Sequence, residues 1–167
     1  MEDRSFTLKM RDGEYCRDVT DVLNEIIAEM HLYYCYIHVQ QEHTTCALTI
    51  NEKESGLIDD LLRRLDQLAP RSQAQHTNNW LSYYFHDDMK IRTENIEQET
   101  EERRNGHAHV KAIDIDRSPL TLRVRYGKVH LGRWQRVLFF DFDDIGPRRE
   151  RTISVSIING TGGRYEL

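Results

Sequence analysis

Long hydrophobic runs are absent from this sequence of 167 residues. No apolar run approaches the roughly 18 residues that a membrane-spanning helix needs, so we expect no membrane partner. The N-terminal stretch MEDRSFTLKMRDGEY contains no apolar segment of the kind that signal peptides carry, and we therefore expect a cytoplasmic protein. No glycine-rich phosphate loop follows a predicted strand, which argues against Rossmann and P-loop nucleotide-binding folds.

Cysteine is also scarce, and acidic residues outnumber basic ones, 28 to 23. The three cysteines, Cys16, Cys35 and Cys46, are odd in number and show no CxxC spacing, which argues against a disulfide framework and against a thiolate zinc knuckle. The formal net charge of -5 argues against a non-specific nucleic-acid binder, since such proteins carry a basic face. We expect no nucleic-acid partner.

Apolar periodicity indicates strands and two helices. Apolar residues recur at helical spacing over 19–30 and 57–68, and Pro70 ends the second helix. Alternating or β-branched patterns predict strands at 5–10, 34–41, 44–50, 120–126 and 153–157. The nearly continuous apolar run at 134–142 is typical of a strand that is covered on both faces, and we expect Trp134 in the core.

These elements show no regular βαβ rhythm, which favours an α+β fold over a doubly wound one. We expect one compact domain over 1–167, with a mixed or mostly antiparallel sheet packed against two or three helices. The charged stretch 71–105 is predicted to be a loop excursion, and 159–167 to be a C-terminal tail.

Histidine is the residue type that points to chemistry, since eight are present and imidazole is a common metal ligand. His43, His86 and the pair His107 and His109 lie in distinctive settings. If the segment of the pair is extended, both rings project to one side and could hold a metal together. If it is helical, the rings diverge by about 200° and only one faces a site. An ordinary structural or surface role fits each of these histidines as well.

Four segments together resemble the YjbQ-like family. They are HTTCALTINE at 43–52, HAHVKA at 107–112, LGRWQRV at 131–137 and GPRRERTISV at 146–155. The resemblance implies a compact α+β fold that assembles as a homotrimer, with a histidine-lined site near a subunit boundary. It places the site histidines at His43, His86 and His109, with His107 as a secondary candidate.

The resemblance also implies further site residues. Glu52 and Asp60 match acidic positions that could orient a histidine or act as a general base. The late motifs contribute Ser118, Gln135, Arg148 and Arg149, which we expect to bind substrate or phosphate. For Glu52 a plain role near a helix N-terminus, and for the two arginines a plain surface role, remain alternatives.

Three imidazoles and a water would form an open site for a divalent metal, zinc in the first place and magnesium where the substrate is phosphorylated. The resemblance implies a secondary thiamine-phosphate synthase activity, a transfer that releases pyrophosphate. A metal-dependent hydrolase of a small phosphorylated or acyl substrate is one alternative. A trimer that binds a metabolite or metal without turnover is the other. The expected partners are a small-molecule substrate and further copies of the chain.

Overall fold

The computed structural model describes residues 3–71, 83–96 and 102–158, so the predicted excursion at 71–105 lies partly, and the tail at 159–167 wholly, outside the described residues. The strands are β1 (Asp3–Lys9), β2 (Cys16–Asp18), β3 (Tyr34–Gln41), β4 (Cys46–Glu52), β5 (Leu120–Arg125), β6 (Lys128–Val129), β7 (Gln135–Asp141) and β8 (Glu150–Ile158). The helices are α1 (Thr20–Glu29), α2 (Ser55–Leu68), the short 3-10 helix η2 (Phe85–Asp87) and α3 (Gly106–Ile115). None of these helices is long and apolar enough to cross a membrane.

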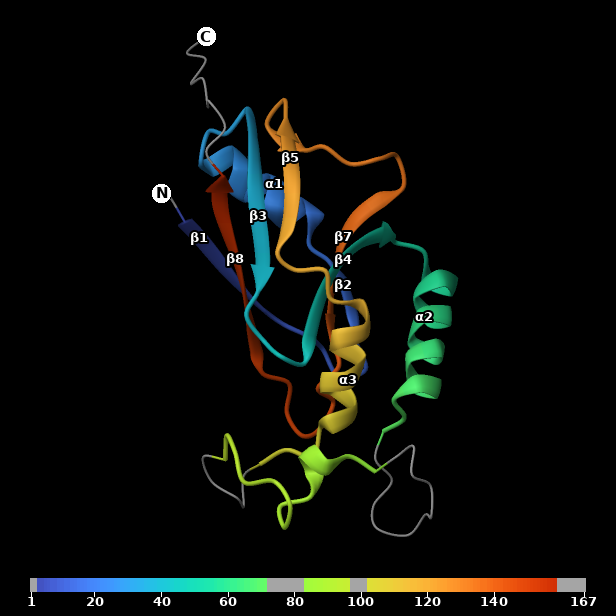
Figure 1. The fold of residues 1–167 in the computed structure, drawn as a ribbon. Coiled ribbons are helices and arrows are strands. Elements are labelled where there is room, and N and C mark those ends of the chain that lie inside the picture. Colours follow the sequence, from blue (N-terminus) through green and yellow to red (C-terminus); the bar gives the residue numbers. More distant parts are fainter. Residues whose placement is uncertain (1–2, 72–82, 97–101, 159–167) are drawn as a thin grey trace.

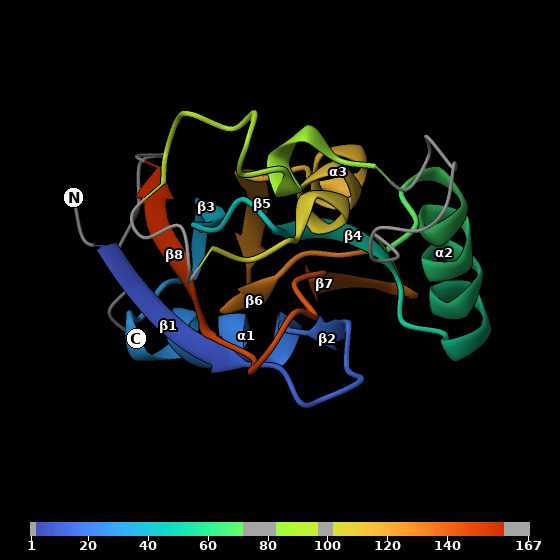
Figure 2. The same ribbon diagram turned by 90° about the horizontal axis from the view of Figure 1, so that it is seen from below.

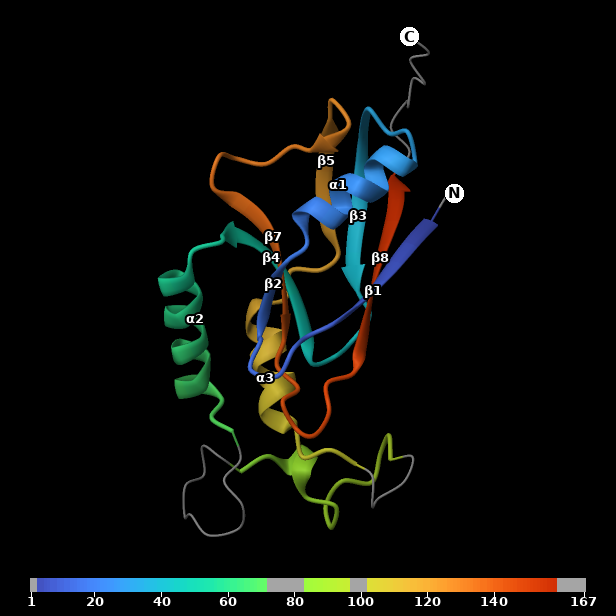
Figure 3. The same ribbon diagram turned by 180° about the vertical axis from the view of Figure 1, so that it is seen from behind.

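The strands form two antiparallel sheets, as Figure 1 shows. Five strands pair in the order β1-β8-β3-β5-β6, and three pair in the order β2-β7-β4. Seen from behind, α1 lies across the five-stranded sheet, while α2 and α3 lie on the side of the three-stranded sheet (Figure 3). The expected α+β class with mostly antiparallel pairing is confirmed.

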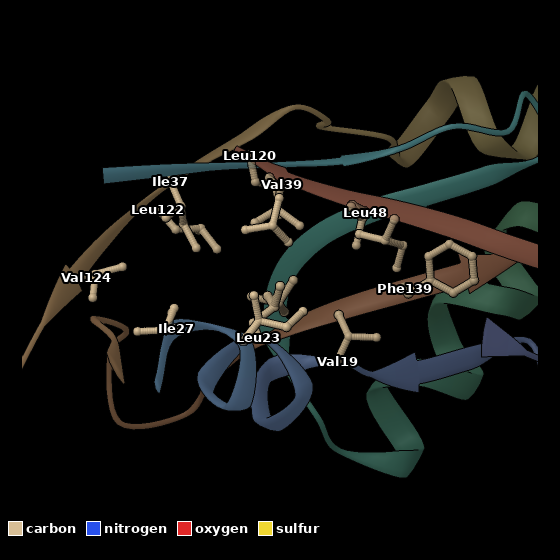
Figure 4. Packing of buried hydrophobic residues seen from close by; sticks show 14 of the residues in the cluster. Val19, Leu23, Ile27, Ile37, Val39, Leu48, Leu120, Leu122, Val124 and Phe139 are labelled. Carbon is tan, nitrogen blue, oxygen red and sulfur yellow. The ribbon is translucent and has the colours of Figure 1, made fainter. Parts of the chain in front are cut away.

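The main core lies between α1 and the inner faces of the two sheets. Leu23 and Ile27, one turn apart on α1, lie opposite Ile37 and Val39, which alternate on β3 (Figure 4). Positions four apart on a helix and two apart on a strand share one face, so each apolar pattern buries a single stripe. This shared stripe holds the five-stranded sheet against the rest of the molecule.

Strand β7 belongs to both cores, as its continuous apolar run predicts. Val137 and Phe139 pack in the main core, whereas Leu138 and Phe140 pack in a second core with Leu65 of α2 and alanines of α3. Alternate side chains of a strand point to opposite faces, so a strand with a layer on each face is apolar throughout. The prediction of a strand covered on both faces is confirmed.

Trp134 is not in the core, because β7 begins one residue later, at Gln135. Its side chain is 62% exposed and stacks under the guanidinium of Arg133, 4.6 Å from the ring centroid. The predicted strand therefore begins one residue too early, and the indole lies in the connection before β7.

Candidate functional site

A cavity of about 1160 Å³ opens at the end of the molecule where α3 begins. Its walls come from the turn between β3 and β4, the segment around η2, the first turns of α3 and the connection from β7 to β8. These segments are far apart in the chain but lie side by side in Figures 1 and 2. His43, His86 and His109 all line this cavity.

His86 and His109 form a close imidazole pair, with 4.4 Å between their ring centroids and an angle of 57° between the planes. Burial first, and the neighbouring His86 second, lower the pKa of His109 below its usual value. The ring of His109 also hydrogen-bonds to the backbone of Thr44, which fixes its orientation. His109 is therefore a neutral imidazole at pH 7, with one nitrogen held by the backbone and the other left as a base.

His43 lies in the same wall but is bound to the chain itself. Its Nε2 atom accepts a hydrogen bond of 2.7 Å from the backbone N–H of Thr152, which ties the β3–β4 turn to β8. An imidazole that accepts at Nε2 carries its proton on Nδ1, so no lone pair remains for a ligand. Burial, and next the charge of Arg151, lower the pKa of His43 and favour this neutral form.

The donor set does not fit the expected three-histidine metal site. Within the described ranges, no three His, Cys, Asp or Glu side chains are grouped so that they could hold a metal ion. The physical reason is that Nε2 of His43 already accepts a hydrogen bond from the Thr152 N–H, which leaves only His86 and His109 of the predicted set as imidazole ligands. The expected ligand set is therefore not formed in this arrangement, and we derive no chemical step through a metal.

The floor of the cavity is an ion cluster that surrounds Asp143. The guanidinium of Arg151 donates to both carboxylate oxygens of Asp141, at 2.9 and 3.1 Å, and to Asp143 at 3.4 Å. Arg103 donates to the same oxygen of Asp143 at 2.9 Å and to the carbonyl of Pro147 at 2.7 Å. Buried charges of this kind persist only when they are paired, so these groups stabilise the wall.

Arg149 differs from the other arginines of the cavity because its side chain has no ion pair or hydrogen bond with any described residue. Arg92 is bound by the carboxylate of Glu102 at 3.1 Å and by the carbonyl of Asn95 at 2.7 Å. Arg149 is exposed and two residues from Arg151 at the start of β8. It is thus the guanidinium that is free to meet a bound anion.

The pair His107 and His109 lies on α3, which decides between the two arrangements that the sequence left open. His109 faces the cavity, whereas His107 is buried at 1% exposure and its Nε2 lies 3.1 Å from Asp144 Oδ1. Two positions apart on a helix point to different sides. His107 is therefore outside the cavity, in a hydrogen-bonded contact with the β7–β8 connection.

The two predicted catalytic acids do not line the cavity. Glu52 ends β4 with an exposed side chain, so it is not a first-turn residue of α2, whose N-terminus is capped by Glu54 instead. Asp60 is exposed on α2 and forms an ion pair of 2.9 Å with Arg63. The structure does not bring either acid to the histidines.

Ser118 and Gln135 also lie outside the cavity, and both make local contacts. The Ser118 hydroxyl donates to Asp116 at 2.8 Å, and Asp116 accepts a further bond from the backbone N–H of Leu48. Gln135 accepts from the N–H of Gly132 at 2.8 Å. These bonds fix the α3–β5 and β6–β7 connections.

Arg148 does not fit the expected phosphate-binding role, because it is buried and both of its terminal nitrogens already donate to carbonyls. The buried guanidinium donates to the carbonyls of Asp141, Asp143 and Glu14, at 3.3, 2.9 and 3.2 Å. It also stacks over the ring of Tyr15, at 5.0 Å. Of the two predicted arginines, only Arg149 reaches the cavity.

Sequence reasoning missed Arg92, Arg103, Asp143 and Arg151 as cavity residues. A signal for two of them was present. Asp143 belongs to the acidic run DFDD, which begins with the last residue of β7. Arg151 is two positions from Arg149, and residues two apart in extended chain face the same side. Arg92 and Arg103 come from the charged excursion, where composition alone indicates a solvated surface.

The family follows from comparison with known proteins. The sequence profile described as "UPF0047 protein YjbQ-like" matches residues 4–160. The chain belongs to the YjbQ-like family. A UPF0047 protein of Archaeoglobus fulgidus is 33% identical over 147 residues, which cover 88% of this chain and 94% of the relative. The UPF0047 protein YugU of Bacillus subtilis is 30% identical over 137 residues, which cover 79% and 78%.

Solved structures agree with the YjbQ-like fold. A hypothetical protein of Aeropyrum pernix K1 superimposes with a TM-score of 0.70 at 26% identity, covering 96% of this chain and all (100%) of that chain. An uncharacterised YjbQ/UPF0047 protein of Clostridium acetobutylicum gives a TM-score of 0.66 at 26% identity, with 93% and 99% covered. The described residues, with two antiparallel sheets and three α-helices, thus match solved structures of this fold.

Proposed function

We propose that the cavity binds a small phosphorylated molecule and that His109 accepts a proton from it. The observation that carries this proposal is that one cavity holds both the guanidinium of Arg149, which no described residue pairs, and a half-buried neutral imidazole. Guanidinium groups match phosphate oxygens in geometry and charge. A neutral, oriented imidazole is the most common general base in proteins.

The residues around His109 support its role as a base. The hydrogen bond to the Thr44 backbone holds the ring, and His86 beside it disfavours a second positive charge. Arg92 Nη1 lies 3.5 Å from His86 Nε2, and the carboxylate of Glu102 accepts a hydrogen bond from the same nitrogen and neutralises the guanidinium. A proton taken by His109 would stay on the ring nitrogen that the backbone does not hold.

The functions expected from the sequence differ in which of these two features, the anion site and the base, they require. They are thiamine-phosphate synthesis as a secondary activity, hydrolysis of a small phosphorylated or acyl substrate, and metabolite binding without turnover. Two assays separate them: pyrophosphate release from the pyrimidine diphosphate and thiazole phosphate precursors, and hydrolysis of p-nitrophenyl phosphate and p-nitrophenyl acetate. In either reaction the His109→Asn variant should lose turnover while it still binds the phosphate group.

Titration with inorganic phosphate tests the anion site directly. Arg149→Met should weaken phosphate binding by about tenfold or more, the size of one charge-assisted hydrogen bond. The matched control is Arg133→Met, which removes an equally exposed arginine that stacks on Trp134 outside the cavity. Absence of phosphate binding to the wild-type protein, or equal affinities for the two variants, would refute the proposal.

A further inference from the structure

The carboxylate of Asp143 is incompletely satisfied although it is buried. The residue is 1% exposed and lines the cavity, and its two guanidinium partners, Arg103 and Arg151, bond to the same oxygen, Oδ2. The other oxygen, Oδ1, has no hydrogen-bond partner among the residues that the structure describes. A buried acceptor without a donor is destabilising, and more so when the group is charged.

Asn105 is a second buried polar side chain that lines the cavity. It precedes α3, is 7% exposed, and its side chain makes no capping hydrogen bond to the helix. Its amide can donate and accept, whereas the carboxylate of Asp143 can only accept. The buried residues of the lining therefore offer acceptors that match hydroxyl or amine donors.

The exposed and the buried side chains of the cavity lining thus differ in chemistry. Arg149 is exposed, and its guanidinium, which no described residue pairs, suits an anion. Asp143 is buried, and its Oδ1 atom can only accept a hydrogen bond. A molecule that satisfies both side chains has a phosphate group and an O–H or N–H donor.

We propose that the ligand of this cavity is a hydroxylated phosphate monoester, the chemical class of phosphorylated polyols and sugars. Its phosphate binds Arg149, and a hydroxyl group donates to Oδ1 of Asp143. This inference rests on the proposed function, because it names the class of molecule that the same cavity takes. Asp143 then acts as a specificity residue, which selects donors rather than the phosphate.

Two probes of equal carbon number test the inference on the full chain. Glycerol 3-phosphate and propyl phosphate share the phosphate group, but only the first carries hydroxyls. We expect glycerol 3-phosphate to bind about tenfold more tightly to the wild-type protein, as measured by calorimetric or NMR titration. Arg149→Met should weaken both probes by the same factor.

Asp143→Asn should remove most of the preference for glycerol 3-phosphate. The matched control, Asp114→Asn, makes the same chemical change at an exposed position of α3 that does not line the cavity, and should keep the preference. Because Asp143 also binds Arg103 and Arg151, thermal melting must show that the variant folds. If the variant does not fold, the preference of the wild-type protein for glycerol 3-phosphate over propyl phosphate decides whether the ligand class is right.

Each outcome has a distinct meaning. Equal binding of the two probes to the wild-type protein overturns the hydroxyl inference and leaves the proposed phosphate site intact. Binding of neither probe overturns both. A preference that survives in folded Asp143→Asn shows that Asp143 is not the specificity residue.

Discussion

Gly106 lies where the start of α3 packs against the segment that carries His86. Its replacement by alanine tests the packing that brings His86 and His109 together. It is the first residue of α3, and its N–H donates to Asp87 Oδ1 of η2 at 2.8 Å. A Cβ atom at this position would lie 2.5 Å from Cβ and 2.8 Å from Cγ of Tyr84. Carbon atoms normally pack at about 3.5–4.0 Å, so η2 must move by about 1 Å.

The cost follows from two opposing effects. Overpacking of a fixed site costs about 1–3 kcal/mol, whereas alanine gains at most about 1 kcal/mol over glycine in a helix. We expect Gly106→Ala to lower the free energy of unfolding by about 1–2 kcal/mol. The shift should also move His86 away from His109.

Urea unfolding gives the stability, and NMR of the imidazole C–H protons reports the pair. Gly56→Ala is the matched control, since it makes the same change in the first turn of α2. There the new Cβ would meet only the flexible carboxylate end of Glu54, at 3.1 Å. If Gly106→Ala proves as stable as Gly56→Ala, with unchanged imidazole signals, the packing of η2 on α3 described above is wrong.

Three further predictions concern the histidines. Because the pKa values of His43 and His109 are lowered from 6.5, the unfolded chain binds more protons below that pH than the native one. The free energy of unfolding should therefore fall as the pH drops from about 6.5 through the lowered pKa values. The His109→Gln variant should show a weaker dependence of this free energy on pH in denaturation experiments. An unchanged pH dependence would contradict the burial of His109. His43→Leu removes the acceptor of the Thr152 N–H and should lower the free energy of unfolding in urea by about 1–3 kcal/mol. The control His130→Ala should not lower it, and equal losses of stability in the two variants would contradict the hydrogen bond. Metal analysis after dialysis against zinc should show that any retained zinc falls in His109→Ala but not in His43→Leu; a loss confined to His43→Leu would restore His43 as a ligand.

Much of the fold could be read from the sequence because apolar periodicity is a local property. The strand over 34–41 and the helix ending before Pro70 were placed within a residue or two, since each buries one stripe against a neighbour. The position of Trp134 was misjudged for the same reason. A continuous apolar run shows that a strand is covered, but not at which residue the cover ends.

The sequence by itself determined the class of fold and the family, because patterns of burial and ordered motifs are written along the chain. It also supplied His43, His86 and His109 as one set, which the structure places in one cavity. Only the tertiary structure decided what each of them is free to do, since this depends on partners distant in sequence. The Thr152 amide that donates to Nε2 of His43 lies 109 positions further along the chain, and Asp143 lies 40 positions from its partner Arg103. Lone pairs and donors are assigned by such contacts, which no local pattern encodes.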